Sequence, residues 1–170
     1  MNFDTAFKLV IGHEGGYTAN RADAGNWTGG KVGLGELKGT KYGIAANSYQ
    51  KLDIKNLTLD QAKIIYKRDY WDRVKCDQLP QPLAFHVFDM AVNSGVSRGA
   101  KLLQRCVNVT QDGLIGPATL KALSGYDDAT LVMLYNSERI SFYTSLPTFS
   151  TFGKGWMNRV SSNLKLGVSK

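Results

Sequence analysis

LAFHVFDMAVN, residues 83–93, is the stretch that decides the fold. Its apolar side chains lie on nearly all sides of a helix, which is typical of a helix buried at the centre of a domain. Pro82 suits the first turn of that helix, and Gly95 suits its end. Within it, we expect His86 to be a core histidine whose hydrogen bonds are satisfied. The segment therefore predicts a mostly helical protein with residues 83–93 as its central helix.

Patterns typical of helices occur on both sides of this segment. Residues 2–13 place Phe3 and Phe7 on one face. Thr58 is followed three residues later by Gln61, which is the spacing of a capping box. The further helices that we expect cover residues 43–51, 58–71, 97–107, 117–123, 127–145 and 151–166.

Residues 15–42 differ in kind, because they are rich in glycine and show almost no apolar periodicity. They predict a loop lobe with a short hairpin. Long loops within compact domains are usually functional, so this lobe is the first place to look for chemistry. The sequence predicts an α+β fold, mainly α-helical. We expect residues 1–170 to form a single catalytic domain, with the Gly-rich lobe at 15–42 and a helical lobe at 83–166.

The 170 residues carry a net charge of +7. A basic surface suits a polyanion, either nucleic acid or an acidic cell envelope. The Lys and Arg residues are scattered without a nucleic-acid-binding motif, so we expect no nucleic-acid partner. Apolar stretches are far shorter than the roughly 20 residues of a membrane span. Because Asp4 interrupts the first segment, we expect no signal peptide and synthesis in the cytoplasm. We expect a monomer.

Glu14 is the first candidate catalytic residue. The chain has three Glu, and this one stands where the first helix should end. The negative end of the helix dipole and burial both raise the pKa of a carboxyl group. A carboxylic acid that stays partly protonated near neutral pH is what a general acid needs. The alternative is an ordinary solvated glutamate.

Asp23 lies nine residues after Glu14 in the loop lobe. On its own it reads as an Asx-turn residue. Paired with Glu14, it suits the cleavage of a glycosidic bond, in which one carboxyl protonates the leaving oxygen and a second group activates water or stabilises positive charge. Thr28 and Thr40 are both candidates to position that water. Thr40 stands where the lobe should enter the helix at 43–51, so a helix N-cap is its alternative role.

Four ordered blocks carry a family resemblance: His13–Tyr17, Asp23–Gly25 with Thr40–Ile44, Phe88–Gly95 and Gln111–Leu120. Together they resemble the glycoside hydrolase family 108 muramidases, which are lysozyme-like endolysins found mostly in phages and prophages. The resemblance spans about residues 3–160 and implies a lysozyme-like fold. It implies that Glu14 is the catalytic glutamate and that Asp23 and a threonine complete a Glu-Asp-Thr arrangement.

The chain departs from the shorter family form in one place, because residues 26–39 stand between the aspartate and the threonine block. The Tyr-Gly-Ile context assigns the threonine role to Thr40, whereas distance from Asp23 favours Thr28. We choose Thr40, since its context is more specific than a spacing across a Gly-rich loop.

The resemblance implies hydrolysis of β-1,4 bonds between N-acetylmuramic acid and N-acetylglucosamine in peptidoglycan glycan strands. We favour inversion over retention. Tyr17 and Tyr42 could stack on sugar rings or pack in the protein, and Asn93 could bind an acetamido group or cap its helix. No metal or cofactor is implied. The rival functions are a lytic transglycosylase, which cleaves the same bond without water, and a non-catalytic wall-binding protein.

The resemblance to endolysins also implies a location. Such an enzyme waits in the host cytoplasm until a holin opens the inner membrane, and it then acts on the wall in the periplasm. The positive net charge would draw it to an anionic envelope. The block Gln111–Leu120 resembles a segment often labelled a peptidoglycan-binding motif, but it is too short to hold a core of its own. We therefore expect it to be part of the single domain.

Overall fold

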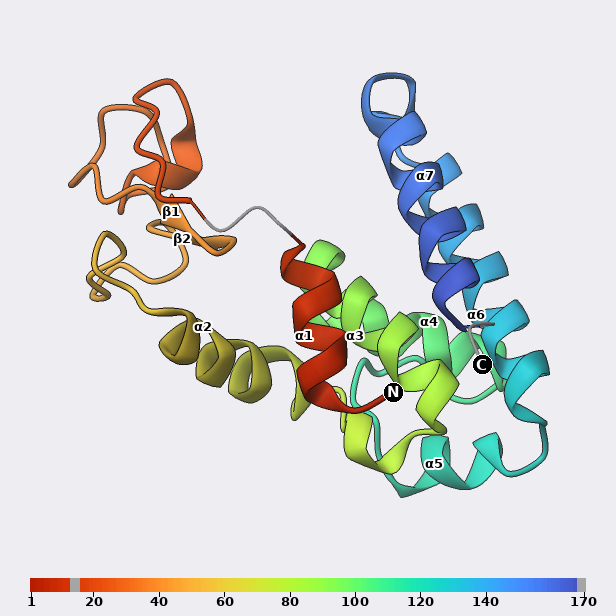
Figure 1. Cartoon of the computed structure of the whole chain (residues 1–170). Coiled ribbons are helices and arrows are strands. Elements are labelled where there is room, and N and C mark those ends of the chain that lie inside the picture. Colours follow the sequence, from red (N-terminus) through yellow and green to blue (C-terminus); the bar gives the residue numbers. More distant parts are fainter. Residues whose placement is uncertain (13–15, 168–170) are drawn as a thin grey trace. The chain divides into compact units, whose positions relative to one another are not determined.

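The computed structural model describes residues 1–12 and 16–167 (Figure 1). Contacts between Cα atoms divide the chain into two compact units. The N-terminal unit is Phe3–Arg68, and the C-terminal unit is Asp69–Lys170 together with Met1–Asn2. Helices dominate the C-terminal unit, whereas the described part of the N-terminal unit consists of α1, α2, long loops and a two-stranded antiparallel sheet. The predicted α+β class, dominated by helices, is confirmed.

Two helices frame the N-terminal unit: α1 (Phe3–Ile11) and α2 (Leu59–Tyr66). On α1, Phe7 is buried and meets the ring of Tyr66 edge to face, with 5.5 Å between centroids. The capping box of α2 is present: Thr58 accepts from the Gln61 amide, and the Gln61 side chain accepts from the Thr58 amide. After Tyr66 the chain continues as a π-helical turn to Trp71.

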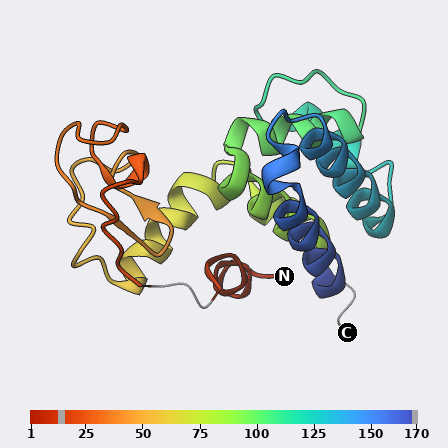
Figure 2. The same ribbon diagram turned by 90° about the horizontal axis from the view of Figure 1, so that it is seen from above.

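Between these helices the chain folds into the loop lobe, gathered around the hairpin of β1 (Thr40–Lys41) and β2 (Ile44–Ala45) (Figure 2). The helix expected at residues 43–51 is wrong. Tyr42 and Gly43 both have positive φ, at 52° and 72°, which makes the two-residue turn that joins antiparallel strands. The Tyr66 hydroxyl donates to the Tyr42 carbonyl at 3.0 Å and so holds this turn against α2.

Helix α3 (Gln81–Ser94) is the centre of the C-terminal unit, as the sequence predicts. Every side chain from Leu83 to Ala91 on it is buried. Helix α4 (Val96–Cys106) crosses α3 closely at Gly99, where an added Cβ would lie 3.3 Å from the Val87 carbonyl oxygen. Trp71 packs edge to face on Phe88 at 5.3 Å. Close helix packing therefore builds this core.

The remaining helices complete the C-terminal unit: α5 (Pro117–Leu123), α6 (Asp128–Thr144) and α7 (Phe149–Gly167). Helix α6 packs on α3 and α4, and α7 runs back along α6 as a helical hairpin (Figure 1). Asp127 caps α6 through the Thr130 amide at 2.8 Å. No helix within the described residues is long and apolar enough to cross a bilayer.

Candidate active site

Asp23 lies at the start of a short 3-10 helix, Ala24–Asn26, in the loop lobe. Its Oδ1 atom accepts from the Gly25 amide at 2.8 Å, so it caps that helix as an Asx turn. The side chain is nonetheless exposed. The backbone of Asp23 is thus fixed while its carboxylate faces solvent.

Asn26, which the sequence reading missed, is the buried hub of this lobe, with 0% of its surface exposed. Its backbone carbonyl accepts from the amides of Lys38 and Gly39, both at 3.0 Å. Its side-chain nitrogen donates to the Asn20 carbonyl at 3.1 Å, and its Oδ1 accepts from the Thr40 hydroxyl at 2.7 Å. Asn26 therefore ties the 3-10 helix that Asp23 caps to strand β1.

Thr40 lies on a strand, not at the entrance of a helix as the sequence reading expected. Its amide and carbonyl pair with those of Thr18 at 2.8 and 2.9 Å, in an isolated antiparallel bridge. Its hydroxyl hydrogen is used by Asn26, so the lone pairs of Oγ1 are what it can offer to a further partner.

Thr28 is placed differently from Thr40. Its Oγ1 accepts from the Glu36 amide at 2.9 Å, and its own amide donates to the Glu36 carbonyl at 3.0 Å. These contacts close the loop that follows the isolated bridge between Trp27 and Leu37. The structure thus links Thr40, and not Thr28, to the Asp23 helix through Asn26.

Tyr17 is an exposed aromatic residue of the same lobe, with 38% of its surface accessible. Its ring covers Gly39, where an added Cβ would lie 2.7 Å from the Tyr17 Cε2 atom. It also lines a pocket of about 330 Å³. Tyr42 is half-buried, and the Lys41 ammonium group lies 5.4 Å from the centroid of its ring. Tyr42 has a turn-forming role, whereas Tyr17 presents a face to solvent.

Glu14 lies outside the described residues. Helix α1 ends at Ile11, and Gly12 follows with a φ of 60°. Positive φ is typical of the residue that terminates a helix. The first helix therefore ends before Glu14. The place of the Glu14 carboxyl group at the end of this helix stays a prediction.

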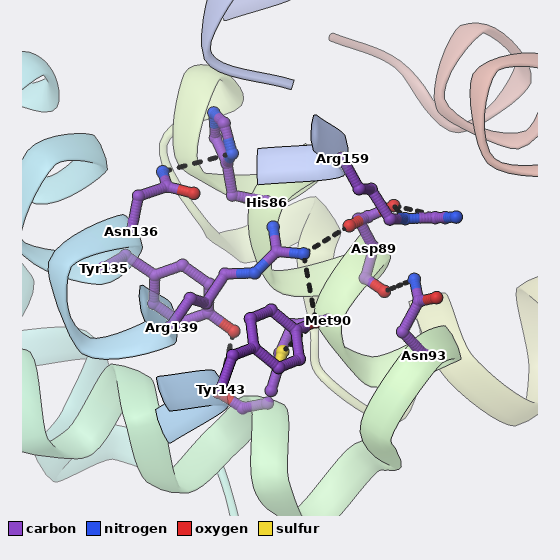
Figure 3. A network of polar contacts seen from close by, with 10 residues as sticks. His86, Asp89, Met90, Asn93, Tyr135, Asn136, Arg139, Tyr143 and Arg159 are labelled. Carbon is purple, nitrogen blue, oxygen red and sulfur yellow. Dashed lines mark hydrogen bonds and ion pairs between the residues drawn. The ribbon is translucent and has the colours of Figure 1, made fainter. Parts of the chain in front are cut away.

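Asn93 lies on α3, in the C-terminal unit, and is exposed. Its side-chain nitrogen donates to the Asp89 carbonyl one helical turn earlier, at 2.7 Å (Figure 3). The helix is followed by Gly95, with a φ of 93°. The side chain therefore stabilises the last turn of α3.

Next to Asn93, a buried polar network crosses the core of the C-terminal unit (Figure 3). Asp89 on α3 receives Arg139 from α6 at 2.6 Å and Arg159 from α7 at 2.6 and 2.9 Å. The Asp89 and Arg139 side chains are 1% and 0% exposed. Since the ion pair is closed to solvent, we assign it a structural role.

His86 lies in the same network, and its Nδ1 meets the Asn136 amide at 3.2 Å. The prediction of a core histidine is confirmed in its burial, but not in its hydrogen bonds, because Nε2 has no hydrogen-bond partner among the residues that the structure describes. Burial, with the nearby charge of Arg139, lowers its pKa to about 4. His86 is thus a neutral side chain at physiological pH and does not act as a base at the surface.

The block Gln111–Leu120 is organised by one buried residue of α4, Gln104. The Gln104 amide nitrogen donates to Asp112 Oδ1 at 2.6 Å and to the Leu114 carbonyl at 3.0 Å, and its oxygen accepts from the Gly113 amide at 2.9 Å. Gly113 has a φ of 81°. The residues of this block therefore form a turn that hydrogen bonds from Gln104 hold against α4. Within residues 1–12 and 16–167, no group of three His, Cys, Asp or Glu side chains could hold a metal ion.

Comparison with known proteins identifies two family models along the chain. One, described as "Glycosyl hydrolase 108", matches residues 7–95, and the other, described as "Predicted Peptidoglycan domain", matches residues 98–161. A solved structure titled "Structure of Brucella abortus SagA" matches at 33% identity and a TM-score of 0.81, over 98% of this chain and 93% of that one. No curated protein matches. Asp23, Thr40 and Asn93 lie within the first model.

Proposed function

Because the chain belongs to the glycosyl hydrolase 108 family and is a lysozyme-like glycoside hydrolase that acts on peptidoglycan, we propose that it is an N-acetylmuramidase. The bond that it cleaves in this proposal is the β-1,4 link between N-acetylmuramic acid and N-acetylglucosamine. Glu14 serves as the general acid, and Asp23 and Thr40 hold the attacking water.

The proposed reaction needs one proton donor and one proton acceptor. Glu14 protonates the bridging oxygen as its bond to the anomeric carbon breaks. Water adds its oxygen to that carbon from the opposite face and passes a proton to the Asp23 carboxylate. This sequence inverts the anomeric centre and suits carboxyl groups that are about 6.5–9.5 Å apart.

The observation that carries the assignment is the hydrogen bond from Thr40 to buried Asn26, at 2.7 Å. A threonine whose proton is already donated can accept a hydrogen bond from water. The Asp23 carboxylate is also an acceptor. Two acceptors take up both hydrogens of a water and leave an oxygen lone pair for attack. Thr28 is less suited, since its oxygen already accepts from Glu36.

We further propose that Tyr17 stacks on a sugar ring, because its ring is exposed on the lobe that carries Asp23 and Thr40. Tyr42 and Asn93 remain proposed substrate contacts, the first half-buried beside Thr40 and the second exposed at the end of α3. The second family model starts at residue 98, but α4 and α6 share a core with α3. This shared core argues against a domain boundary between α3 and α4, and we keep one catalytic domain over residues 1–170 as a proposal.

The deciding experiment is digestion of purified peptidoglycan, with mass analysis of the fragments. We expect reducing-end muropeptides from the wild type and a loss of roughly 10²–10⁴-fold in rate for Glu14→Gln. Asp23→Asn and Thr40→Val should lower the rate without changing the product. Glu36→Gln, an exposed carboxyl of the same lobe, is the matched control and should retain full activity.

Two outcomes would reject the proposed muramidase activity. Fragments that end in 1,6-anhydro sugars would make the chain a lytic transglycosylase. Full activity of Glu14→Gln would remove this residue from the reaction. Hydrolysis in ¹⁸O-labelled water, followed by early detection of the α or β anomer by NMR, separates inversion from retention.

We propose host lysis as the biological role, on the strength of the resemblance of the sequence blocks to phage endolysins. The enzyme would stay in the host cytoplasm until a holin opens the inner membrane. Expression in a Gram-negative host should leave the culture intact without a holin and lyse it with one. Lysis without a holin would contradict this role.

A further inference from the structure

The pocket beside Tyr17 has features that the cleavage of a sugar–sugar bond does not require. It holds about 330 Å³ and is formed by Tyr17, residues 37–38 and residues 51–55. A second hollow of about 430 Å³, formed by residues 48–52, shares Lys51 and Leu52 with it. Both belong to the N-terminal unit. Thr18, the neighbour of Tyr17, pairs with Thr40, so the pocket adjoins the strand that carries the proposed water ligand.

One part of the pocket lining is apolar. Tyr17 presents an exposed ring, Leu37 and Leu52 are half-buried, and Ile54 is buried. An aromatic ring with aliphatic side chains favours ligands that carry alkyl groups.

The other part of the lining is cationic. Lys38 already has partners, since its ammonium group donates to the Gln50 carbonyl at 2.8 Å and pairs with Glu36 at 3.2 Å. Lys51 and Lys55 are exposed and have no ion-pair partner among the residues that the structure describes. These two ammonium groups can therefore receive anions from outside.

The acidic residue of the lining, Asp53, offsets only part of this charge. Asp53 accepts from the Asn56 side chain at 2.9 Å and from the Asn56 amide at 3.3 Å. These hydrogen bonds keep the Asp53 pKa below its usual value, and the positive charges of Lys38 and Lys55 also help to lower this pKa. Because Glu36 offsets Lys38, the lining is left with Lys51 and Lys55 against Asp53 and so carries an excess of positive charge.

The segment that carries the two lysines is held in place. The Lys41 ammonium group donates to the Lys55 carbonyl at 3.1 Å, and Lys38 holds the Gln50 carbonyl. Ile54 and Leu57 anchor the segment in the core. Lys51 and Lys55 therefore extend from a fixed backbone, so less conformational entropy is lost when a ligand binds.

We propose that this pocket binds the acidic peptide stem of peptidoglycan, with Lys51 and Lys55 on its carboxylates and Leu37 and Leu52 against its alkyl groups. This inference rests on the proposed function. In intact peptidoglycan the sugars are neutral, because the lactyl carboxyl of muramic acid is bound in an amide, whereas the stem keeps free carboxylates. An amphiphilic cationic pocket beside the glycan site fits the stem better than a sugar. The enzyme should therefore prefer glycan strands that carry peptides.

The first test measures binding and needs no catalysis. Isothermal titration of the wild type with soluble tetrapeptide stem should give a saturable affinity. Lys51→Gln/Lys55→Gln should weaken that affinity roughly three- to ten-fold. Lys31→Gln/Lys121→Gln removes the same charge at exposed positions outside the pocket and should bind like the wild type. Equal affinity for the wild type and the pocket variant would overturn the proposal.

The second test compares cleavage of intact peptidoglycan with cleavage of strands from which an amidase has removed the peptides. The amidase frees the lactyl carboxylate of each muramic acid, so these groups are converted to methylamides before the comparison. The pocket variant should lose several-fold in kcat/KM on intact strands and should match the wild type on stripped strands. The control variant should match the wild type on both substrates. Equal losses on both substrates would overturn the stem assignment. If the wild type cleaves neither substrate, the proposed function fails. The titration alone then decides whether the pocket binds the peptide stem.

Discussion

Replacement of Asp89 by Asn tests the buried network of the C-terminal unit. Asp89→Asn keeps the size of the side chain but removes the negative charge that faces two guanidinium groups (Figure 3). It also turns an acceptor atom into an amide donor. Arg139 then stays in the core as a cation without a counterion, because Asp89 is its ion-pair partner. We expect a large loss of stability with little change in the folded structure.

The magnitude follows from the burial of the two arginines. Arg139 is 0% exposed, and within residues 1–12 and 16–167 its Nε and Nη1 atoms have no hydrogen-bond partner, so little else compensates its charge. Removal of one partner from a buried ion pair costs about 3–5 kcal/mol. Arg159 is 34% exposed and can be hydrated, so Arg159→Gln should cost about 1 kcal/mol or less. A domain whose total stability is about 5–15 kcal/mol would be close to unfolding in the Asp89 variant.

Urea denaturation, followed by circular dichroism and tryptophan fluorescence, measures both losses. The double variant Asp89→Leu/Arg139→Met provides the internal control, because it removes both charges and leaves an apolar core. It should be more stable than Asp89→Asn alone. A loss below about 1 kcal/mol for Asp89→Asn would refute the reasoning, as would a double variant less stable than the single one.

Two further predictions concern stability. The folded pKa of His86 is about 4, against 6.5 for a free histidine, so the unfolded chain takes up the proton first on acidification. Stability should fall by about 2 kcal/mol between pH 7 and pH 5, and His86→Gln should remove most of that slope in urea titrations at both pH values. Gly39→Ala would drive a Cβ into the Thr18 carbonyl and the Tyr17 ring at a φ of 79°, and should cost about 2–4 kcal/mol by thermal unfolding. Gly155→Ala on α7 should be neutral or stabilising, because apart from its chain neighbours and the backbone of its own helix no described atom lies within 4 Å of its Cβ position. Equal effects of the two substitutions would contradict the steric argument.

The helices were predictable because their signals are local. Pro117–Leu123 matches α5 at both ends, and Asp127 caps α6 as its sequence position suggests. The capping box of Thr58 and Gln61 sets the start of α2. Each signal lies within four residues of the helix end that it sets, so no knowledge of the fold is needed to read it.

The loop lobe was not predictable in the same way. The turn at Tyr42–Gly43 stands where the helix expected at residues 43–51 would begin. It is held by a hydrogen bond from Tyr66, which lies 24 residues after Tyr42. Asn26 takes its importance from Thr40, Lys38 and Gly39, all distant in sequence. An asparagine in a Gly-rich loop carries no local sign of such a role. The lobe is therefore fixed by long-range hydrogen bonds that a reading of neighbouring residues misses.

The contrast between local and long-range hydrogen bonds also separates the polar residues with a structural role from the one proposed for catalysis. His86 and Asp89 stand in an apolar helix, and their partners come from α6 and α7, 50 and 70 residues away. Asp23, in contrast, has its hydrogen-bond partner two residues away and keeps its carboxylate in solvent. A buried carboxylate between two arginines cannot meet a polysaccharide, whereas an exposed one on a braced loop can. Exposure and a fixed backbone are thus the reasons why Asp23, and not Asp89, is the aspartate that we propose for catalysis.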